Sequence, residues 1–233
     1  MTIALICAMP MELAPLTKKL DLQKETRGGV KMRVGKIGDQ NVVAIHTGMG
    51  PELAHDSTEA LLSAVDNITR VVVFGITGAV HDHTEIGELI VPEKVVNALT
   101  GSEHTPTPHG ATPKGVMWTT NVITPAHELP PLIERGVVSL DMETAVIGAC
   151  CDRRNIPWSV RRAISDRATD GSVTEEVFKM ANMDGTPNPK RVAAFFLKHP
   201  NKVPAMMRMA KGGKRATEVA ADAAIAAAKY SPT

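Results

Sequence analysis

A continuous apolar run at Val71–Phe74 constrains the fold of this 233-residue chain more than any other segment. Such a run predicts a strand covered on both faces, because a strand with one face in water alternates apolar and polar residues. Thr2–Ala8 is another apolar run, too short for a helix, and 157–164 is predicted to form a further strand. Together with the helical segments between them, these runs predict one large α/β domain over residues 1–233.

Composition excludes several classes of protein. The formal net charge is +1, from 26 basic and 25 acidic residues, which gives no electrostatic footprint for nucleic acid or for an anionic membrane. Aromatic residues make up 3%, too few for base-stacking platforms, and no stretch approaches the roughly 20 apolar residues of a membrane span. We therefore expect a small-molecule partner, with neither nucleic acid nor membrane as a ligand.

Cysteine usage indicates a reducing compartment. Cys7, Cys150 and Cys151 form no CxxC pattern and no disulfide framework. The amino terminus lacks a basic segment ahead of its apolar run, and Glu12 follows soon after, so we expect a first strand and not a signal peptide. These features predict a cytoplasmic protein.

Carboxylates occur at element ends in two parts of the chain. Residues 139–170 are predicted to form a loop, a helix capped by Asp141 with Glu143 in its first turn, and a strand that ends at Asp166. Glu12 lies in the first turn of another helix, directly after the first strand. Because strand carboxyl ends and helix amino ends meet at the ligand crevice of an open α/β sheet, we expect these acids to converge.

Three other motifs have weaker functional interpretations. Residues 47–50 form a GxG turn between a strand and a helix, but the next strand ends in no ribose-binding acid, which disfavours a dinucleotide site. His81-Asp82-His83 lacks a further ligand, so we expect no metal there and no cofactor elsewhere. In the helical carboxyl-terminal part, from about residue 188, a basic stretch favours a solvated face over an anion-binding patch. Its members are Lys198, Lys202, Arg208, Lys211, Lys214 and Arg215.

Several motifs together resemble the nucleoside phosphorylase/nucleosidase superfamily, and most closely the bacterial methylthioadenosine/S-adenosylhomocysteine nucleosidases. Residues 6–12 resemble the first strand and water-activating glutamate of that family, and 47–50 and 75–79 resemble its glycine-rich turns. Asp141-Met142-Glu143 and residues 162–166 (RAISD) resemble its two most diagnostic motifs. These pieces span residues 1–170 in the expected order.

The resemblance implies a three-layer α/β/α sandwich around a mixed, twisted sheet, commonly in a homodimer. It implies hydrolysis of a purine nucleoside by water in methionine salvage, with Glu12 activating water and Asp166 facing N7 of the purine. Glu143 would bind the ribose hydroxyls and Met142 the sugar face. Further substrate contacts are expected from Ala8, Met9, Met49, Thr77, Gly78, Ser165 and Val122.

The residue types suit this chemistry. Cleavage of an N-glycosidic bond builds positive charge on the sugar and pushes electrons into the base, so an acid must protonate the purine. A carboxyl in a desolvated place keeps its proton near neutral pH, and Asp166 at the end of an apolar strand meets this requirement. Glu12, at a helix amino end, is expected to stay ionised and take a proton from water.

The match departs from the family pattern around the base. Ile76 replaces a serine whose hydroxyl Thr77 is expected to supply, Ala79-Val80 replaces a glycine and its neighbour, and the segment from 96 to 139 is short. Two alternatives stay open. A phosphorylase would need a cationic phosphate cradle, and no arginine occurs between Met9 and Lys18 or in the segment from Gly75 to Gly87. A non-catalytic nucleoside-binding protein would leave three acids in a cleft without chemistry.

Overall fold

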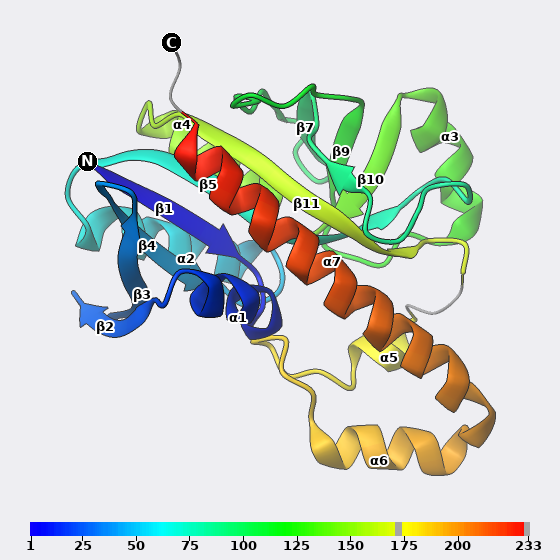
Figure 1. Cartoon of the computed structure of the whole chain (residues 1–233). Coiled ribbons are helices and arrows are strands. Elements are labelled where there is room, and N and C mark those ends of the chain that lie inside the picture. The colour runs from blue at the N-terminus through cyan, green and yellow to red at the C-terminus, as the bar shows by residue number, and fades with distance from the viewer. Residues whose placement is uncertain (171–173, 231–233) are drawn as a thin grey trace.

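A computed structural model describes residues 1–170 and 174–230, and its strands form one mixed sheet (Figure 1). The strands are β1 Thr2–Cys7, β2 Gln23–Arg27, β3 Val30–Ile37, β4 Gln40–His46, β5 Ile68–Ala79, β6 Leu89–Ile90, β7 Lys94–Asn97, β8 Glu103–His104, β9 Val116–Thr119, β10 Val137–Asp141 and β11 Trp158–Arg167. The helices are α1 Pro10–Lys19, α2 Pro51–Ala64, η1 Ala126–Glu128, α3 Leu129–Glu134, α4 Thr144–Arg153, α5 Glu175–Phe178, α6 Pro189–Lys198, η2 Pro200–Lys202 and α7 Val203–Lys229.

The long strand β5 is the axis of the sheet. It pairs in parallel with β1 on one side and with β11 on the other, and β1 pairs in parallel with β4. The carboxyl-terminal end of β5 also pairs antiparallel with β10, which starts a second run through β9, β7 and β8. Because the sheet branches at this end of β5, strands from distant parts of the chain terminate close to one another.

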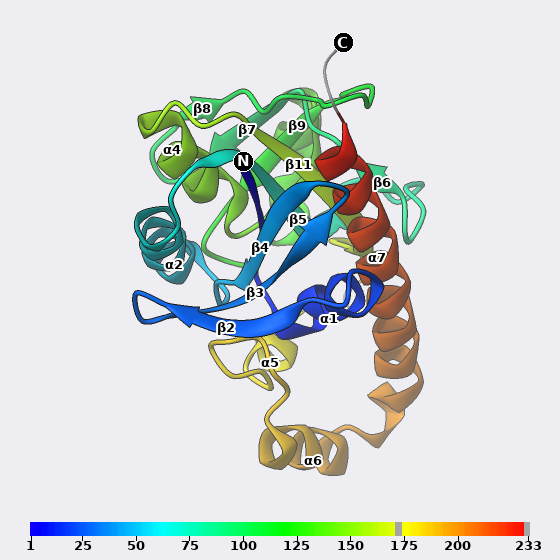
Figure 2. The ribbon, with the colours of Figure 1, turned by 60° about the vertical axis from the view of Figure 1, so that its left-hand side comes forward.

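Helices cover both faces of the central strands, which confirms the predicted three-layer α/β/α arrangement (Figures 1 and 2). Val71 and Val73 pack in one buried cluster with residues of α2 and α4. Val72 and Phe74 pack in the other cluster with residues of α1 and α7. Successive residues of a strand point to opposite faces, so this continuous apolar run is buried on both sides. The described residues include no helix that is long and apolar enough to cross a membrane.

Some predicted boundaries differ from the structure. Residues 75–79 were expected to form a turn, but β5 continues through them to Ala79. Residues 139–141 were expected in a loop, but they are the end of β10, and α4 begins only at Thr144. Positions 75 and 78 are glycines inside a strand, and side chains of other elements lie where their Cβ atoms would be.

The carboxyl-terminal helices divide into two parts. From Ala216 onward α7 packs against the sheet, with alanines buried in the cluster that contains Phe74. The part before it, formed by α5, α6, η2 and the start of α7, projects beyond the central strands (Figure 1). We call residues 185–217 the basic arm, because this stretch contains eight of the chain's Lys and Arg residues and no Asp or Glu.

Candidate active site

The carboxylate of Glu12 lies fully buried where α1 meets the middle of β5. Its Oε2 accepts hydrogen bonds from the backbone N–H groups of Ala8 and Met9, at 2.9 and 2.7 Å, and its Oε1 accepts one from Ile76 at 2.7 Å. A Cβ at Gly75 would lie 2.2 Å from Oε1, and Gly75 has φ +140°. Glycine at this position therefore allows the carboxylate to lie directly against the strand.

Burial and hydrogen bonding act in opposite directions on this group. Burial raises the pKa of the Glu12 carboxyl above its ordinary value, while Arg162 and the three backbone donors lower it, and the net direction is upward. The sequence predicted only the effect of the helix end, which favours the charge. The structure corrects that expectation, since desolvation outweighs the donors.

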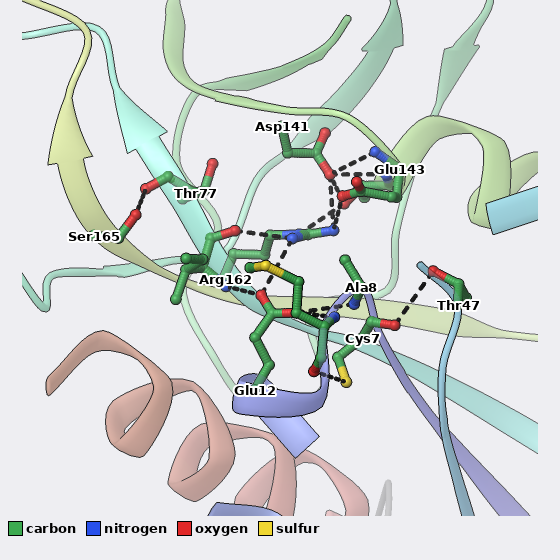
Figure 3. A network of polar contacts seen from close by, with 12 residues as sticks. Cys7, Ala8, Glu12, Thr47, Thr77, Asp141, Glu143, Arg162 and Ser165 are labelled. Atoms are coloured by element: carbon green, nitrogen blue, oxygen red, sulfur yellow. Dashed lines mark hydrogen bonds and ion pairs between the residues drawn. The ribbon is translucent and has the colours of Figure 1, made fainter. Parts of the chain in front are cut away.

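Arg162 is the centre of a buried charge network (Figure 3). One of its terminal nitrogens lies 2.9 Å from Asp141 and 3.2 Å from Glu143, and the other lies 4.0 Å from Glu12. The guanidinium also donates to the carbonyl of Ile76 at 2.8 Å. A buried guanidinium needs such partners, and the three carboxylates in turn need a cation.

Asp141 organises the entry to α4 without being its formal cap residue. Its Oδ2 accepts from the backbone N–H of Thr144 at 2.8 Å and from the Thr144 hydroxyl at 2.5 Å, while Oδ1 accepts from the Thr119 hydroxyl at 2.6 Å. Glu143 occupies the cap position itself. The predicted capping role of Asp141 is thus fulfilled from the end of β10, which frees the side chain of Glu143 to point into the network.

Glu143 joins the network to the glycine-rich turn after β4. Its Oε1 accepts from the backbone N–H of Gly50 at 2.9 Å, and its Oε2 accepts from Arg162 at 3.2 Å. Burial and the neighbouring Asp141 raise the pKa of Glu143 to about 7, against the lowering effects of Arg162 and of the Gly50 N–H. This carboxyl therefore changes its charge near neutral pH.

Asp166 lies at the end of β11, where the strand is irregular. Ile164 pairs with Thr77 and Asp166 pairs with Gly78, so Ser165 is an extra residue in the ladder. Such a bulge changes the direction of the side chains that follow it. The Ser165 hydroxyl donates to Asp166 Oδ1 at 2.5 Å, and Oδ2 would lie 3.3 Å from a Cβ at Gly78.

The environment of Asp166 favours the protonated form. Burial raises the pKa of this carboxyl and Asp170 raises it further, while only the Ser165 hydroxyl lowers it. No hydrogen bond or ion pair joins Asp166 to a cation among residues 1–170 and 174–230. Asp166 and Ser165 line a cavity of about 550 Å³ that extends toward α7, and Glu12 and Glu143 are not among its lining residues.

Glu12 and Asp166 are carried by the same stretch of sheet. Glu12 touches Gly75 and Asp166 lies beside Gly78, three residues further along β5. At about 3.3 Å per residue these positions are about 10 Å apart. The two acids therefore lie at nearby positions along one strand, with Glu12 fully buried and Asp166 lining the cavity.

The remaining predicted residues have varied surroundings. Met9 and Met49 are half-buried, and a loop after α5 covers both: a Cβ at Gly185 would lie 2.3 Å from Met9, and the N–H of Met49 donates to Met183 at 3.0 Å. The Thr77 hydroxyl, expected to replace a serine, donates instead to the carbonyl of Leu140 at 2.7 Å.

Two predicted contacts have no link to this network in the structure. Met142 is half-buried between Asp141 and Glu143. Val122 is 60% exposed, and no hydrogen bond of the described residues joins it to the carboxylates. The structure therefore assembles Ala8, Met9, Gly78 and Ser165 around the two acids but does not bring Val122 to them.

Arg162 is a candidate site residue that the sequence reasoning did not single out. The signal was available, because a charged residue inside an apolar strand is rare unless it is paired. Arg161 beside it points to the other face and donates to the carbonyl of Pro108 at a hydrogen-bond distance of 2.5 Å. Which of the two arginines meets the acids depends on how β11 faces its neighbours, and a single sequence does not show this.

One group among the described residues has the composition of a metal site, formed by His55, Glu59 and Cys150. The Glu59 carboxylate already pairs with Arg153 at 2.8 Å and with Arg154. Two guanidinium groups at one carboxylate would repel a divalent cation. We interpret this cluster as an ion-pair contact between α2 and α4.

The two acids have the arrangement required for paired proton transfer. Glu12 is held by three N–H donors near an arginine, and Asp166 is desolvated without a paired cation. Environments that separate two carboxyls in this way allow one to donate a proton while the other accepts one. Glu143, between Gly50 and Arg162, has an oxygen geometry suited to accepting hydrogen bonds from a ligand.

Comparisons with known proteins identify similar sequences and similar folds. The sequence family described as the Phosphorylase superfamily matches residues 2–132. The 5'-methylthioadenosine/S-adenosylhomocysteine nucleosidase of Oceanobacillus iheyensis is 23% identical over 211 residues, which cover 76% of this chain and 92% of that protein.

Solved structures with the same fold cover nearly the whole chain. The S-adenosylhomocysteine nucleosidase of Streptococcus pyogenes, in complex with 5-methylthiotubericidin, superposes with a TM-score of 0.74 at 18% identity, covering 100% of this chain and 98% of that one. The futalosine hydrolase of Helicobacter pylori superposes with a TM-score of 0.70 at 14% identity, covering 96% of each chain.

Proposed function

The chain belongs to the phosphorylase superfamily, and from this premise we propose that it hydrolyses the N-glycosidic bond of a purine nucleoside. The products would be the free base and the sugar. The observation that carries the proposal is the pair of carboxyls at Gly75 and Gly78, one beside an arginine and one without a cation. The relatives include nucleosidases for methylthioadenosine and S-adenosylhomocysteine, so these two nucleosides are the first substrates to test.

Asp166 is proposed as the acid that protonates the purine at N7. Its raised pKa supports this role, because the carboxyl must still hold a proton near neutral pH. The Ser165 hydroxyl, 2.5 Å from Oδ1, leaves Oδ2 available to the base. As the C1′–N9 bond breaks, its electron pair moves into the base and is neutralised by this proton.

Glu12 is proposed as the base that takes a proton from water. Three backbone donors fix its carboxylate, so little reorganisation is needed when the proton arrives. A base with a pKa raised toward the working pH accepts protons more effectively than an ordinary glutamate. The water oxygen would then attack C1′ of the sugar.

Glu143 is proposed to accept hydrogen bonds from the ribose hydroxyls, with Met142 beside the sugar. Positioning of this kind contributes by holding the reacting bond between the two acids. Ala8, Met9, Met49, Thr77 and Gly78 are proposed to line the remaining substrate site. Two chains are proposed to form a homodimer, which light scattering coupled to size exclusion would test.

Water is favoured over phosphate as the nucleophile. Arg162 is a cation at the candidate site. It comes from β11 and not from a glycine-rich turn, so the absence of arginines near those turns does not account for it. Its charge is already offset by Glu12, Asp141 and Glu143. A dianionic phosphate approaching these carboxylates would be repelled.

A panel assay for free base tests the proposal. Methylthioadenosine, S-adenosylhomocysteine, adenosine and inosine would be incubated with the protein in phosphate-free buffer and again with added phosphate. Release of base without phosphate is expected. Turnover only with phosphate would establish phosphorolysis, and tight nucleoside binding without base release in either buffer would establish a binding protein.

A further inference from the structure

We propose that the cavity beside Asp166 contains an anion-binding subsite formed by Lys202 and Arg208. The inference rests on the proposed function and specifies its substrate class: a purine nucleoside that also carries a phosphate or carboxylate group. The sequence alone favoured a solvated face for the basic stretch that contains these two residues. The structure changes that interpretation because it brings both of them to the cavity.

The cavity has walls of different chemistry. One wall is the end of β11, with Ser165 and Asp166, and the opposite elements are η2 and the first turns of α7. Its volume of about 550 Å³ lies within the range typical of ligand sites. The α7 wall presents apolar Met206 and Met209 together with the two cations, so it can take a substituent that is apolar in part and charged at one end.

Neither Lys202 nor Arg208 forms a strong ion pair with another described residue. Lys202 Nζ is 4.0 Å from Glu176 and 5.7 Å from the ring centre of Phe195. Arg208 has no ion pair or side-chain hydrogen bond with another described residue, and it is exposed at the cavity. A guanidinium and an ammonium left in this state match the bidentate and point-charge recognition of phosphate or carboxylate.

The other charged side chains that line the cavity either form ion pairs or already have a proposed catalytic role. Arg167 donates to the carbonyl of Thr84 at 2.8 Å and lies 3.7 Å from Asp170, so these two charges offset one another. Asp166 is the proposed proton donor. The charge that remains on the lining is therefore positive and comes from the α7 side.

The electrostatic field of the basic arm also favours anionic ligands at the cavity. The basic arm, residues 185–217, contains eight of the 26 Lys and Arg residues and none of the 25 Asp and Glu residues, although the whole chain has a net charge of only +1. Such a concentration of one sign beside a cavity attracts anionic ligands and raises their rate of association.

Substrate comparison gives the first arm of the test. We expect kcat/KM for base release to be highest for adenosine 5′-monophosphate or adenosine 5′-carboxylate, which carry phosphate and carboxylate, and lower for neutral methylthioadenosine and adenosine. The first two differ in their anion and so distinguish the two chemical sources. The advantage of the anionic substrate should shrink as salt rises from 0.05 to about 0.5 M, because salt screens exposed charges.

Charge removal gives the second arm. In the Lys202→Gln/Arg208→Gln variant, kcat/KM for the anionic substrate should fall about tenfold or more, through KM, with little change for methylthioadenosine. The matched control is Lys211→Gln/Lys214→Gln, which removes the same charge from exposed positions of α7 that do not line the cavity. This control should lose less than about threefold, since it changes only the field at a distance.

Measurements of ligand binding test the subsite independently of the proposed catalytic function. Calorimetric titration of adenosine 5′-monophosphate, adenosine 5′-carboxylate and neutral methylthioadenosine into a Glu12→Gln background, with and without the Lys202 and Arg208 changes, reports the subsite even if no base is released. A loss of affinity confined to these two changes supports the subsite. Equal effects of the α7 control pair, or equal affinity for neutral and anionic nucleosides, overturn it, while base release from neutral nucleosides would still support the proposed function.

Discussion

Two carboxyl sites three residues apart along β5 differ in almost every electrostatic respect. At Gly75, Glu12 receives three backbone hydrogen bonds and has Arg162 at 4.0 Å. At Gly78, Asp166 receives one hydroxyl hydrogen bond and has another acid, Asp170, as its charged neighbour. Glu12 is fully buried and Asp166 is half-buried, and desolvation raises the pKa of both carboxyls.

The difference shows how one sheet edge can hold an acid and a base. Donors and a cation stabilise the ionised form of Glu12, while the end of β11 offers little to an ionised Asp166. The glycines that admit the carboxyls differ in the same way: a Cβ would meet Glu12 at 2.2 Å but Asp166 at 3.3 Å. The Glu12 carboxylate is fully buried against the strand, and Asp166 lines a cavity.

Replacement of Asp166 by Asn is expected to have the largest effect on catalysis. The amide cannot donate the proton that the departing purine needs, so kcat for base release should fall by about 10⁴-fold. The matching control is p-nitrophenyl riboside, whose leaving group departs without protonation and should lose far less. An equal loss on both substrates would show that Asp166 is not the acid.

Glu12→Gln should reduce hydrolysis by about 10³-fold while nucleoside binding is retained. The effect is smaller because a sugar with oxocarbenium character reacts readily with water. The amide nitrogen of Gln would also face a backbone donor, at Ile76 or at Ala8 and Met9, so the free energy of unfolding should fall by about 1–3 kcal/mol. Turnover near the wild-type rate would exclude Glu12 as the water-activating base.

The two glycines allow the regions to be compared by the same substitution. Gly75→Ala should displace the Glu12 carboxylate by about 1 Å or more and lower kcat by about 10²-fold. Gly78→Ala should cost only a few-fold, because a Cβ at 3.3 Å requires a small adjustment of Asp166. Steady-state kinetics of both variants, with circular dichroism to verify folding, would measure this. A larger loss of kcat in Gly78→Ala than in Gly75→Ala would contradict the conclusion that Glu12 lies closer to its glycine than Asp166 does.

The smallest expected effect is a pH dependence of nucleoside affinity through Glu143. Since burial raises its pKa to about 7, the hydrogen-bond acceptor is lost below this pH, and KM should rise by up to about tenfold per pH unit on the acid side. The same shift implies that the folded state retains a proton that the unfolded state releases above about pH 4.5. Stability from this group is therefore present below about pH 4.5 and is lost as pH rises through 7.

Measurement of KM from pH 5 to 8, together with chemical unfolding over the same range, checks both statements. Glu143→Gln removes the titrating group and should flatten the KM profile. A wild-type KM that stays constant below pH 7 would contradict a role for ionised Glu143 in binding.

The sequence by itself predicted the central strands and singled out the acids as candidate site residues. The apolar run at 71–74 could be buried only on both faces, and Glu12, Glu143 and Asp166 follow from their motifs at element ends. The tertiary structure decided what surrounds each acid. Arg162 meets Glu12 because β11 pairs beside Gly75, and the extra residue Ser165 turns Asp166 toward the cavity under α7. Burial and charge pairing depend on neighbours distant in the chain, so the pKa shifts of both acids arise only on folding.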